Sequence, residues 1–232
     1  DFTSKIGKPL ENFKVAIPKF FLSDIVDGEI KNRILEIKKI LEENNIQVDI
    51  VDIKYLDKTS ILYQIIAMGE ASSNLARFDG VRYGYSYPNP RNVDELYMKT
   101  RQIGFGDEVK RRIMVGSYLL SGNNAKIYYN KALQIRDDLQ KNMQKVFKEY
   151  QLIIGPTTAR CAYDLNTDKD NPLKSFMDDV LVMQANMGGF PSLSMPVGFN
   201  HEHLPIGLQI IGNLKDEATI YLLASFIESN IK

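Results

Sequence analysis

The first fifty residues alternate between strand and helix patterns, and this order constrains the fold more than any other feature of the sequence. A short apolar run, Lys-Val-Ala-Ile at residues 14–17, ends at Pro18. Apolar residues then recur at helical spacing over residues 30–41, and a second apolar run begins at Val48. A strand, a helix of about four turns and a second strand predict a parallel pair joined by a right-handed crossover.

The rest of the chain predicts a long helical region followed by a return to strands. Periodic apolar residues predict helices over residues 60–77, 93–102, 106–120, 125–150 and 173–183, with a loop rich in tyrosine, glycine and proline at 83–90. Further strands are expected at 152–154, 192–197 and 206–211, and Asp216 is expected to cap a final helix. Strands in the first and last thirds of the chain predict an α/β fold with a mixed sheet.

Composition narrows the class of protein. Of the 232 residues, 44% are hydrophobic and 25% are charged, as in ordinary globular proteins. Lysine plus arginine and aspartate plus glutamate each number 29, which argues against a dedicated surface for nucleic acid or an anionic membrane. No apolar run approaches the ~18–20 residues of a membrane span. The single cysteine, Cys161, excludes an intrachain disulfide, and the start at Asp1 rather than methionine predicts a piece of a longer chain.

Self-contained catalytic motifs are missing from the sequence. It has no Gly-x-Ser-x-Gly elbow, no phosphate-binding Walker loop and no Gly-x-Gly-x-x-Gly. The two histidines, His201 and His203, have the spacing of a zinc-ligand pair, but no cysteine or third histidine lies near them, so an exposed connection is expected. Cys161 has no histidine at a suggestive spacing, which favours a structural thiol over a nucleophile.

Two neighbouring arginines occupy different positions on the helix predicted at 106–120. On a helical wheel Arg111 lies almost opposite the apolar stripe, with Asp107 one turn earlier, and is expected to be solvated and paired. Arg112 lies at the border of the stripe and is expected to point along the edge of the core into a cleft. The pattern leaves two roles open for Arg112, ligand binding and structural pairing.

Two neighbouring aspartates differ in the same way on the helix predicted at 173–183. Asp178 has Lys174 four residues before it and is expected at the surface. Asp179 has the apolar residues Phe176 and Val182 as helical neighbours, so it is expected to be an acid in apolar company. The pattern again leaves two roles open for Asp179, ligand binding and structural pairing.

Five sequence blocks together resemble one known family. They are Glu-Ala-Ser-Ser-Asn-Leu-Ala-Arg-Phe-Asp-Gly-Val-Arg-Tyr-Gly at residues 70–84, Gly-Phe-Gly-Asp-Glu-Val-Lys-Arg-Arg-Ile at 104–113, Gly-Pro-Thr at 155–157, Gly-Gly-Phe-Pro-Ser-Leu-Ser-Met-Pro-Val-Gly at 188–198 and Pro-Ile-Gly-Leu-Gln at 205–209. In this order they resemble the glutaminase subunits of tRNA-dependent amidotransferases, a branch of the amidase-signature family. The first two blocks are more specific to that branch, and the others are shared with signature amidases generally.

The resemblance implies the amidase-signature fold, an α/β fold with a mixed sheet and helices on both faces. Residues 1–232 would then form the C-terminal half of a single domain. The family's serine nucleophile, bridging serine and lysine base belong to a Gly/Ser-rich signature in the N-terminal half, and this chain contains no such stretch. No catalytic residue is therefore assigned here, and the chain alone is expected to be inactive.

The resemblance also implies which residues bind the substrate. Arg112 corresponds to the arginine that pairs with the α-carboxylate of glutamine, and Asp179 to the aspartate that holds the α-ammonium group. Tyr63 corresponds to a tyrosine that lines the pocket, although its spacing alone indicates a core aromatic. The implied reaction releases ammonia from glutamine for the conversion of Glu-tRNA(Gln) or Asp-tRNA(Asn) to Gln-tRNA or Asn-tRNA.

The resemblance to the amidotransferase subunits also implies that the chain acts in a heterotrimer with partner proteins. The expected partners are subunits B and C, glutamine and aminoacyl-tRNA; the partner subunit mainly handles the tRNA and uses ATP and Mg²⁺, and this chain is expected to bind no cofactor or metal. The expected location is the cytoplasm, or an organellar matrix in a eukaryote. Two alternatives stay open: the same half of a stand-alone amidase for other amides, and a non-catalytic binding module.

Overall fold

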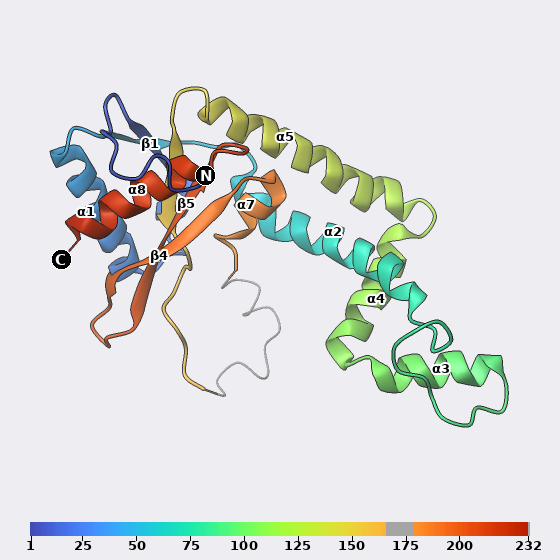
Figure 1. Ribbon diagram of the computed structural model, residues 1–232. Helices are drawn as coiled ribbons and strands as arrows, with labels where there is room; N and C mark the ends of the chain where they lie inside the picture. Colours follow the sequence, from blue (N-terminus) through green and yellow to red (C-terminus); the bar gives the residue numbers. More distant parts are fainter. Residues whose placement is uncertain (166–178, 232) are drawn as a thin grey trace. The chain divides into compact units, whose positions relative to one another are not determined.

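The computed structural model describes residues 1–165 and 179–231, and the chain divides into two compact units (Figure 1). The sheet unit comprises residues 1–60 and 136–232, and the helical unit comprises residues 61–135. Every strand of the described residues belongs to the sheet unit.

The sheet unit is built on a five-stranded sheet in the order β2-β1-β3-β5-β4. β1 (Lys14–Pro18) pairs in parallel with β2 (Gln47–Val51) on one side and with β3 (Leu152–Pro156) on the other. β5 (Pro205–Gly212) runs antiparallel to β3, and β4 (Ser192–Phe199) runs antiparallel to β5. The prediction of a mixed sheet is confirmed.

The crossover between the first two strands is the helix that the sequence predicted. α1 (Gly28–Glu43) begins after Asp27, whose carboxylate accepts a hydrogen bond from the backbone N–H of Glu29 at 2.8 Å. One stripe of the helix is buried, and it consists of Ile30, Ile34, Ile37 and Leu41. Because these apolar side chains need a covering surface, α1 packs against the sheet, where it contacts β2, β3 and β5. It forms the connection between the parallel strands β1 and β2.

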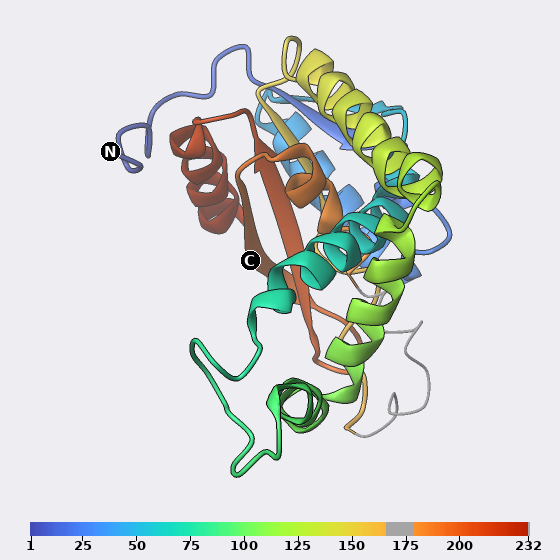
Figure 2. The same ribbon diagram turned by 90° about the vertical axis from the view of Figure 1, so that its right-hand side faces the viewer.

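Helices cover both faces of the sheet, as expected. α1 and α8 (Glu217–Asn230) pack together on one face, whereas α7 (Met183–Gly188) lies on the other beside the second half of α5 (Asn130–Val146) (Figures 1 and 2). Residues of β5 contact helices on both faces of the sheet, because successive side chains of a strand point to opposite faces. Gly212 lies against Ile220 of α8, and the side chain of Gln209 reaches the backbone just before α7.

The start of α8 differs in detail from the prediction for Asp216. This residue occupies the N-cap position, but its carboxylate makes no hydrogen bond to the helix backbone. It accepts hydrogen bonds from Lys5 Nζ at 2.7 Å and from Thr219 Oγ1 at 2.7 Å instead. The charged lysine therefore binds the carboxylate that would otherwise cap the helix backbone. The ion pair links the N-terminal segment to α8.

The helical unit contains the helices predicted for the middle of the chain. α2 (Thr59–Asn74) enters it from the sheet unit and ends in a 3-10 turn, η3 (Leu75–Arg77). α3 (Val93–Gly104) and α4 (Asp107–Leu120) follow a loop, and η4 (Ala125–Tyr129), a π-helical turn, leads into α5. α2 and α4 touch at Gly116, where an added Cβ would lie 2.0 Å from the carbonyl oxygen of Met68. Only glycine permits this close approach of two helix backbones.

One predicted helix is wrong in the part that the structure describes. The prediction covered 173–183, of which 173–178 lie outside the described residues. Residues 179–182 form a turn, and α7 begins only at Met183. Side-chain amides explain the difference, since Gln184 Nε2 donates to the carbonyl of Val180 at 2.7 Å and Gln209 Nε2 donates to that of Leu181 at 2.5 Å. A continuous helix would pair those carbonyls with backbone N–H groups.

Candidate functional site

Three charged side chains form a cluster in the first two turns of α4, a helix of the helical unit that Figure 1 labels. Glu108 accepts two hydrogen bonds from Arg111, from Nε at 2.8 Å and from Nη2 at 2.7 Å. The same carboxylate accepts a third hydrogen bond from Arg112 Nε at 2.8 Å. Both arginines therefore share one acidic partner.

This cluster corrects two expectations about the arginines. Arg111 pairs with Glu108 rather than with Asp107, whose carboxylate lies 3.4 Å from Lys110 Nζ. The side chains of Arg111 and Arg112 are 40% and 42% exposed, so the predicted contrast between a solvated and an edge-facing arginine is not seen in their exposure. The reason is the helix repeat: positions three and four residues after Glu108 both bring a long side chain back to it.

The arginines also set the charge state of the cluster. Hydrogen bonds from Arg111, and then from Arg112, lower the pKa of the Glu108 carboxyl to about 2. The same contact raises the pKa of Arg111. Glu108 is consequently charged at neutral pH and acts as an acceptor only.

Tyr63 and Asp179, the other predicted binding residues, lie in different units. Tyr63 is on α2 in the helical unit, as Arg112 is on α4, and its ring is half-buried. Asp179 belongs to the sheet unit. The binding roles of all three remain predictions from the family resemblance.

Asp179 is exposed, which corrects the expectation of an acid in apolar company. It opens the turn before α7, and its carbonyl accepts a hydrogen bond from the backbone N–H of Val182 at 3.2 Å. Val180 and Leu181, which follow it, are buried instead. The other member of the compared pair, Asp178, lies outside the described residues.

Two buried glutamines hold this turn, and sequence reasoning missed both. Gln184 is fully buried and contacts the carbonyl of Val180; Gln209 is 3% exposed and contacts the carbonyls of Leu181 and, at 2.9 Å, Pro156. Gln209 interrupts the apolar run of β5, and that single polar residue was the available signal. Buried amides of this kind fix a backbone segment because each lost hydrogen bond would leave an unpaired carbonyl.

The histidine pair and the cysteine lie outside any group of three potential metal ligands, since none occurs in the described residues. His201 contacts the Glu29 carboxylate through its ring and, at 2.8 Å, through its backbone N–H. Burial, followed by the negative charges of Asp27 and Glu29, raises the pKa of the Cys161 thiol. A raised pKa keeps the thiol protonated and makes it a poor nucleophile.

Among the helices of the described residues, none combines the length and the apolar composition that a membrane span requires.

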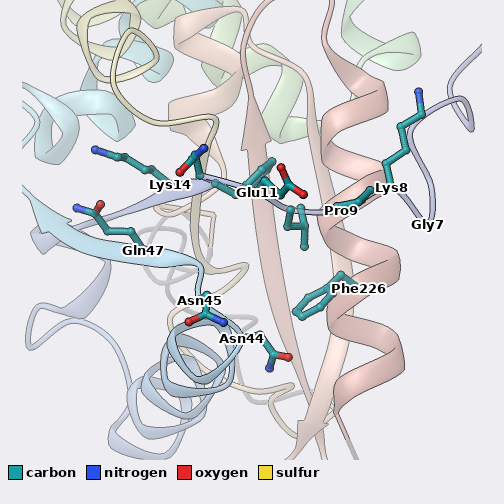
Figure 3. A pocket seen from close by; sticks show the side chains of 12 residues that line it. Gly7, Lys8, Pro9, Glu11, Lys14, Asn44, Asn45, Gln47 and Phe226 are labelled. Carbon is teal, nitrogen blue, oxygen red and sulfur yellow. The ribbon is translucent and has the colours of Figure 1, made fainter.

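A groove of about 790 Å³ lies at another place on the sheet unit (Figure 3). Residues 7–14 line it together with Asn44, Asn45 and Gln47, which follow α1, and with Phe226 of α8. None of the three predicted binding residues lines this groove. The groove is therefore distinct from the predicted glutamine contacts.

Comparison with known sequences adds an independent line of support for the family. A family model described as Amidase matches residues 1–221. The A subunit of the glutamyl-tRNA(Gln) amidotransferase from Streptococcus sanguinis is 43% identical over 229 residues, covering 99% of this chain and 47% of that protein. A protein of the same name from Streptococcus pneumoniae (strain Hungary19A-6) is 44% identical with the same coverage. The chain thus spans about half the length of the curated relatives it matches.

Solved structures share the fold. The A subunit of the glutamyl-tRNA(Gln) amidotransferase from Thermotoga maritima matches with a TM-score of 0.74 and 30% identity, over 98% of this chain and 44% of that one. A bacterial aryl acylamidase of the amidase-signature family also reaches a TM-score of 0.74, at 19% identity, over 99% of this chain and 46% of that one. The second likeness is one of fold alone.

Proposed function

Since this chain belongs to the amidase-signature family, as its five sequence blocks indicated, we propose that it is part of the glutaminase subunit of a tRNA-dependent amidotransferase. The observation that carries the proposal is the identity of 43–44% along 99% of the chain with relatives that bear this name. The aryl acylamidase shares the fold at 19% identity. Similarity in sequence therefore favours the tRNA-linked branch over a stand-alone amidase.

In the proposed reaction this part of the protein binds glutamine. Free glutamine is a zwitterion, so its recognition needs one fixed cation and one fixed anion. Arg112 binds the α-carboxylate, because a guanidinium offers two parallel N–H donors to a carboxylate. Asp179 binds the α-ammonium group, and the Tyr63 ring forms part of the pocket wall. Holding both α-groups fixes the side-chain amide for attack, which is catalysis by positioning.

The nucleophile and base that cleave the amide lie outside these 232 residues in this proposal, which assigns no catalytic residue to the chain. The released ammonia passes to a partner protein of the complex. That partner activates the tRNA-bound carboxylate of Glu-tRNA(Gln) or Asp-tRNA(Asn) with ATP and Mg²⁺. Subunits B and C are the proposed partners.

The test uses the full-length protein that contains this chain, with its partner subunits. Ammonia release is measured with glutamine, with an aliphatic amide and with an aryl amide, and formation of Gln-tRNA or Asn-tRNA is measured with ATP present. The proposal predicts that ammonia release is much faster with glutamine than with the other amides. It also predicts that Gln-tRNA or Asn-tRNA forms only when glutamine is present. Comparable kcat/KM for the aryl or aliphatic amide would instead favour the stand-alone amidase, and no turnover of any amide by folded protein would favour the binding module.

A further inference from the structure

The hydrogen bond between Glu108 and Arg112 uses one particular edge of the arginine. Arg112 donates through Nε, so the carboxylate of Glu108 occupies the side of the guanidinium nearest the helix. The two terminal nitrogens, Nη1 and Nη2, form the other planar edge, which suits a second carboxylate bidentately. The Arg112 side chain is 42% exposed, and its hydrogen bond to Glu108 does not use either terminal nitrogen.

Resting on the proposed role of Arg112, we propose that Glu108 is a positioning residue for glutamine: it holds the Arg112 guanidinium so that the Nη1–Nη2 edge faces the α-carboxylate. An unrestrained arginine would lose the freedom of several rotatable bonds on binding. A guanidinium already held by Glu108 loses less of that freedom, and the affinity rises accordingly.

Arg111 contributes by binding the Glu108 carboxylate as well. Its two hydrogen bonds fix the Glu108 carboxylate in one orientation, with both oxygens engaged. The same bonds lower the pKa of Glu108 to about 2, so the carboxylate stays charged at the pH of any ordinary assay. Arg111 therefore orients Glu108, and Glu108 orients Arg112.

Charge alone predicts the opposite effect of removing Glu108. Two guanidinium groups and one carboxylate carry a net charge of one positive unit, and neutralising the carboxylate would strengthen the attraction for an anionic ligand. Loss of positioning would weaken binding instead. The sign of the change in glutamine KM thus separates the two effects.

The experiment compares Glu108→Gln with Asp107→Asn in the full-length protein within its complex. Asp107 lies in the same turn of α4 and contacts Lys110, so its neutralisation is a matched control for a surface charge near the helix start. Glu108→Gln is expected to raise the glutamine KM about 5- to 20-fold, with kcat changed less than about 2-fold. Asp107→Asn is expected to leave both constants within about 2-fold. A glutamine KM that is unchanged or lower in Glu108→Gln would overturn the inference.

A double-mutant cycle with Arg112→Ala separates this inference from the proposed function. If Glu108 acts through Arg112, Glu108→Gln changes kcat/KM for glutamine less than about 2-fold once Arg112 is alanine. Full additivity of the two substitutions would overturn the positioning role while the proposed function stands. Unchanged glutamine kinetics in Arg112→Ala itself would reject the binding role of Arg112, and with it the proposal on which the inference rests.

Discussion

Arg111 and Arg112 donate hydrogen bonds to the same carboxylate, that of Glu108, although they are adjacent in the sequence and lie on different sides of one helix. The finding changes what is expected of each arginine. A helical wheel alone makes Arg111 a bystander that pairs with Asp107. The structure makes it the residue that orients the shared acid, so its loss is expected to have a small but measurable effect.

The first prediction compares conservative substitutions of the two arginines. Arg112→Lys should lower kcat/KM for glutamine about 30- to 150-fold, because a lysine cannot reproduce a bidentate pair worth roughly 2–3 kcal/mol. Arg111→Lys should cost only about 2- to 3-fold, since a lysine keeps one contact to Glu108. Steady-state ammonia release by the full-length protein measures both. Equal losses from the two substitutions would contradict the assignment of Arg112.

A second prediction concerns the acid at the start of the turn before α7. Asp179→Asn should weaken glutamine binding more than Asp178→Asn does, because only Asp179 is proposed to neutralise the α-ammonium group. Titration calorimetry with a catalytically inactivated full-length protein gives the two dissociation constants. The reverse order would place the ammonium contact on the neighbouring residue.

Gln209 should matter for stability as well as for binding. Gln209→Leu leaves the buried carbonyls of Pro156 and Leu181 without this donor and should lower the free energy of unfolding by about 2–4 kcal/mol. It should also raise the glutamine KM, because the turn that carries Asp179 loses a fixed point. Urea denaturation and glutamine kinetics measure the two effects.

The matched control for that substitution is Gln47→Leu, at an exposed glutamine of β2. Its side chain donates a hydrogen bond to the carboxylate of Asp49 at 2.7 Å in an exposed position, so its loss should change stability by less than about 0.5 kcal/mol. Similar destabilisation by Gln209→Leu and Gln47→Leu would show that the buried hydrogen bonds of Gln209 do not account for its effect on stability.

Cys161 should react slowly with alkylating reagents at neutral pH. Its pKa is raised, so at any given pH a smaller fraction of the thiol is in the reactive thiolate form than for an ordinary cysteine. Mass spectrometry of iodoacetamide labelling should therefore show slower modification than for glutathione at a pH of about 8, with the rate still rising above about pH 9. Cys161→Ser should retain glutamine turnover, and a large loss of activity would give the thiol a role that its environment does not indicate.

The isolated 232-residue chain should release no ammonia from glutamine, because binding groups without a nucleophile form no acyl-enzyme. It should also self-associate, since β2 and β4 are the edge strands of the described sheet and carry exposed apolar side chains at Ile50 and Phe199. An ammonia assay and size-exclusion chromatography test the two statements. Turnover by the chain alone, or a stable monomer, would contradict the corresponding half.

Local sequence determined most of the described elements, because their signals lie within one helix or strand. The spacing of Ile30, Ile34, Ile37 and Leu41 is sufficient to specify α1, and the apolar runs on either side of it specify a parallel pair. The sequence blocks likewise identified the family, since they keep their order over residues 70–209, within the range 1–221 that the family model matches. Within the candidate site, the sequence correctly placed Arg112 on a helix.

Only tertiary structure decided how those elements use their polar side chains. The turn at Asp179 exists because Gln209, 28 residues away from Leu181, reaches its carbonyl from a neighbouring strand, and no periodicity within residues 173–183 records that contact. The choice of Glu108 over Asp107 as the partner of Arg111 is local to α4, since the helix repeat allows both, but it depends on side-chain rotamers that a helical wheel does not contain. Helical periodicity reports which face is apolar, whereas hydrogen bonds between distant residues depend on where the chain brings their atoms together.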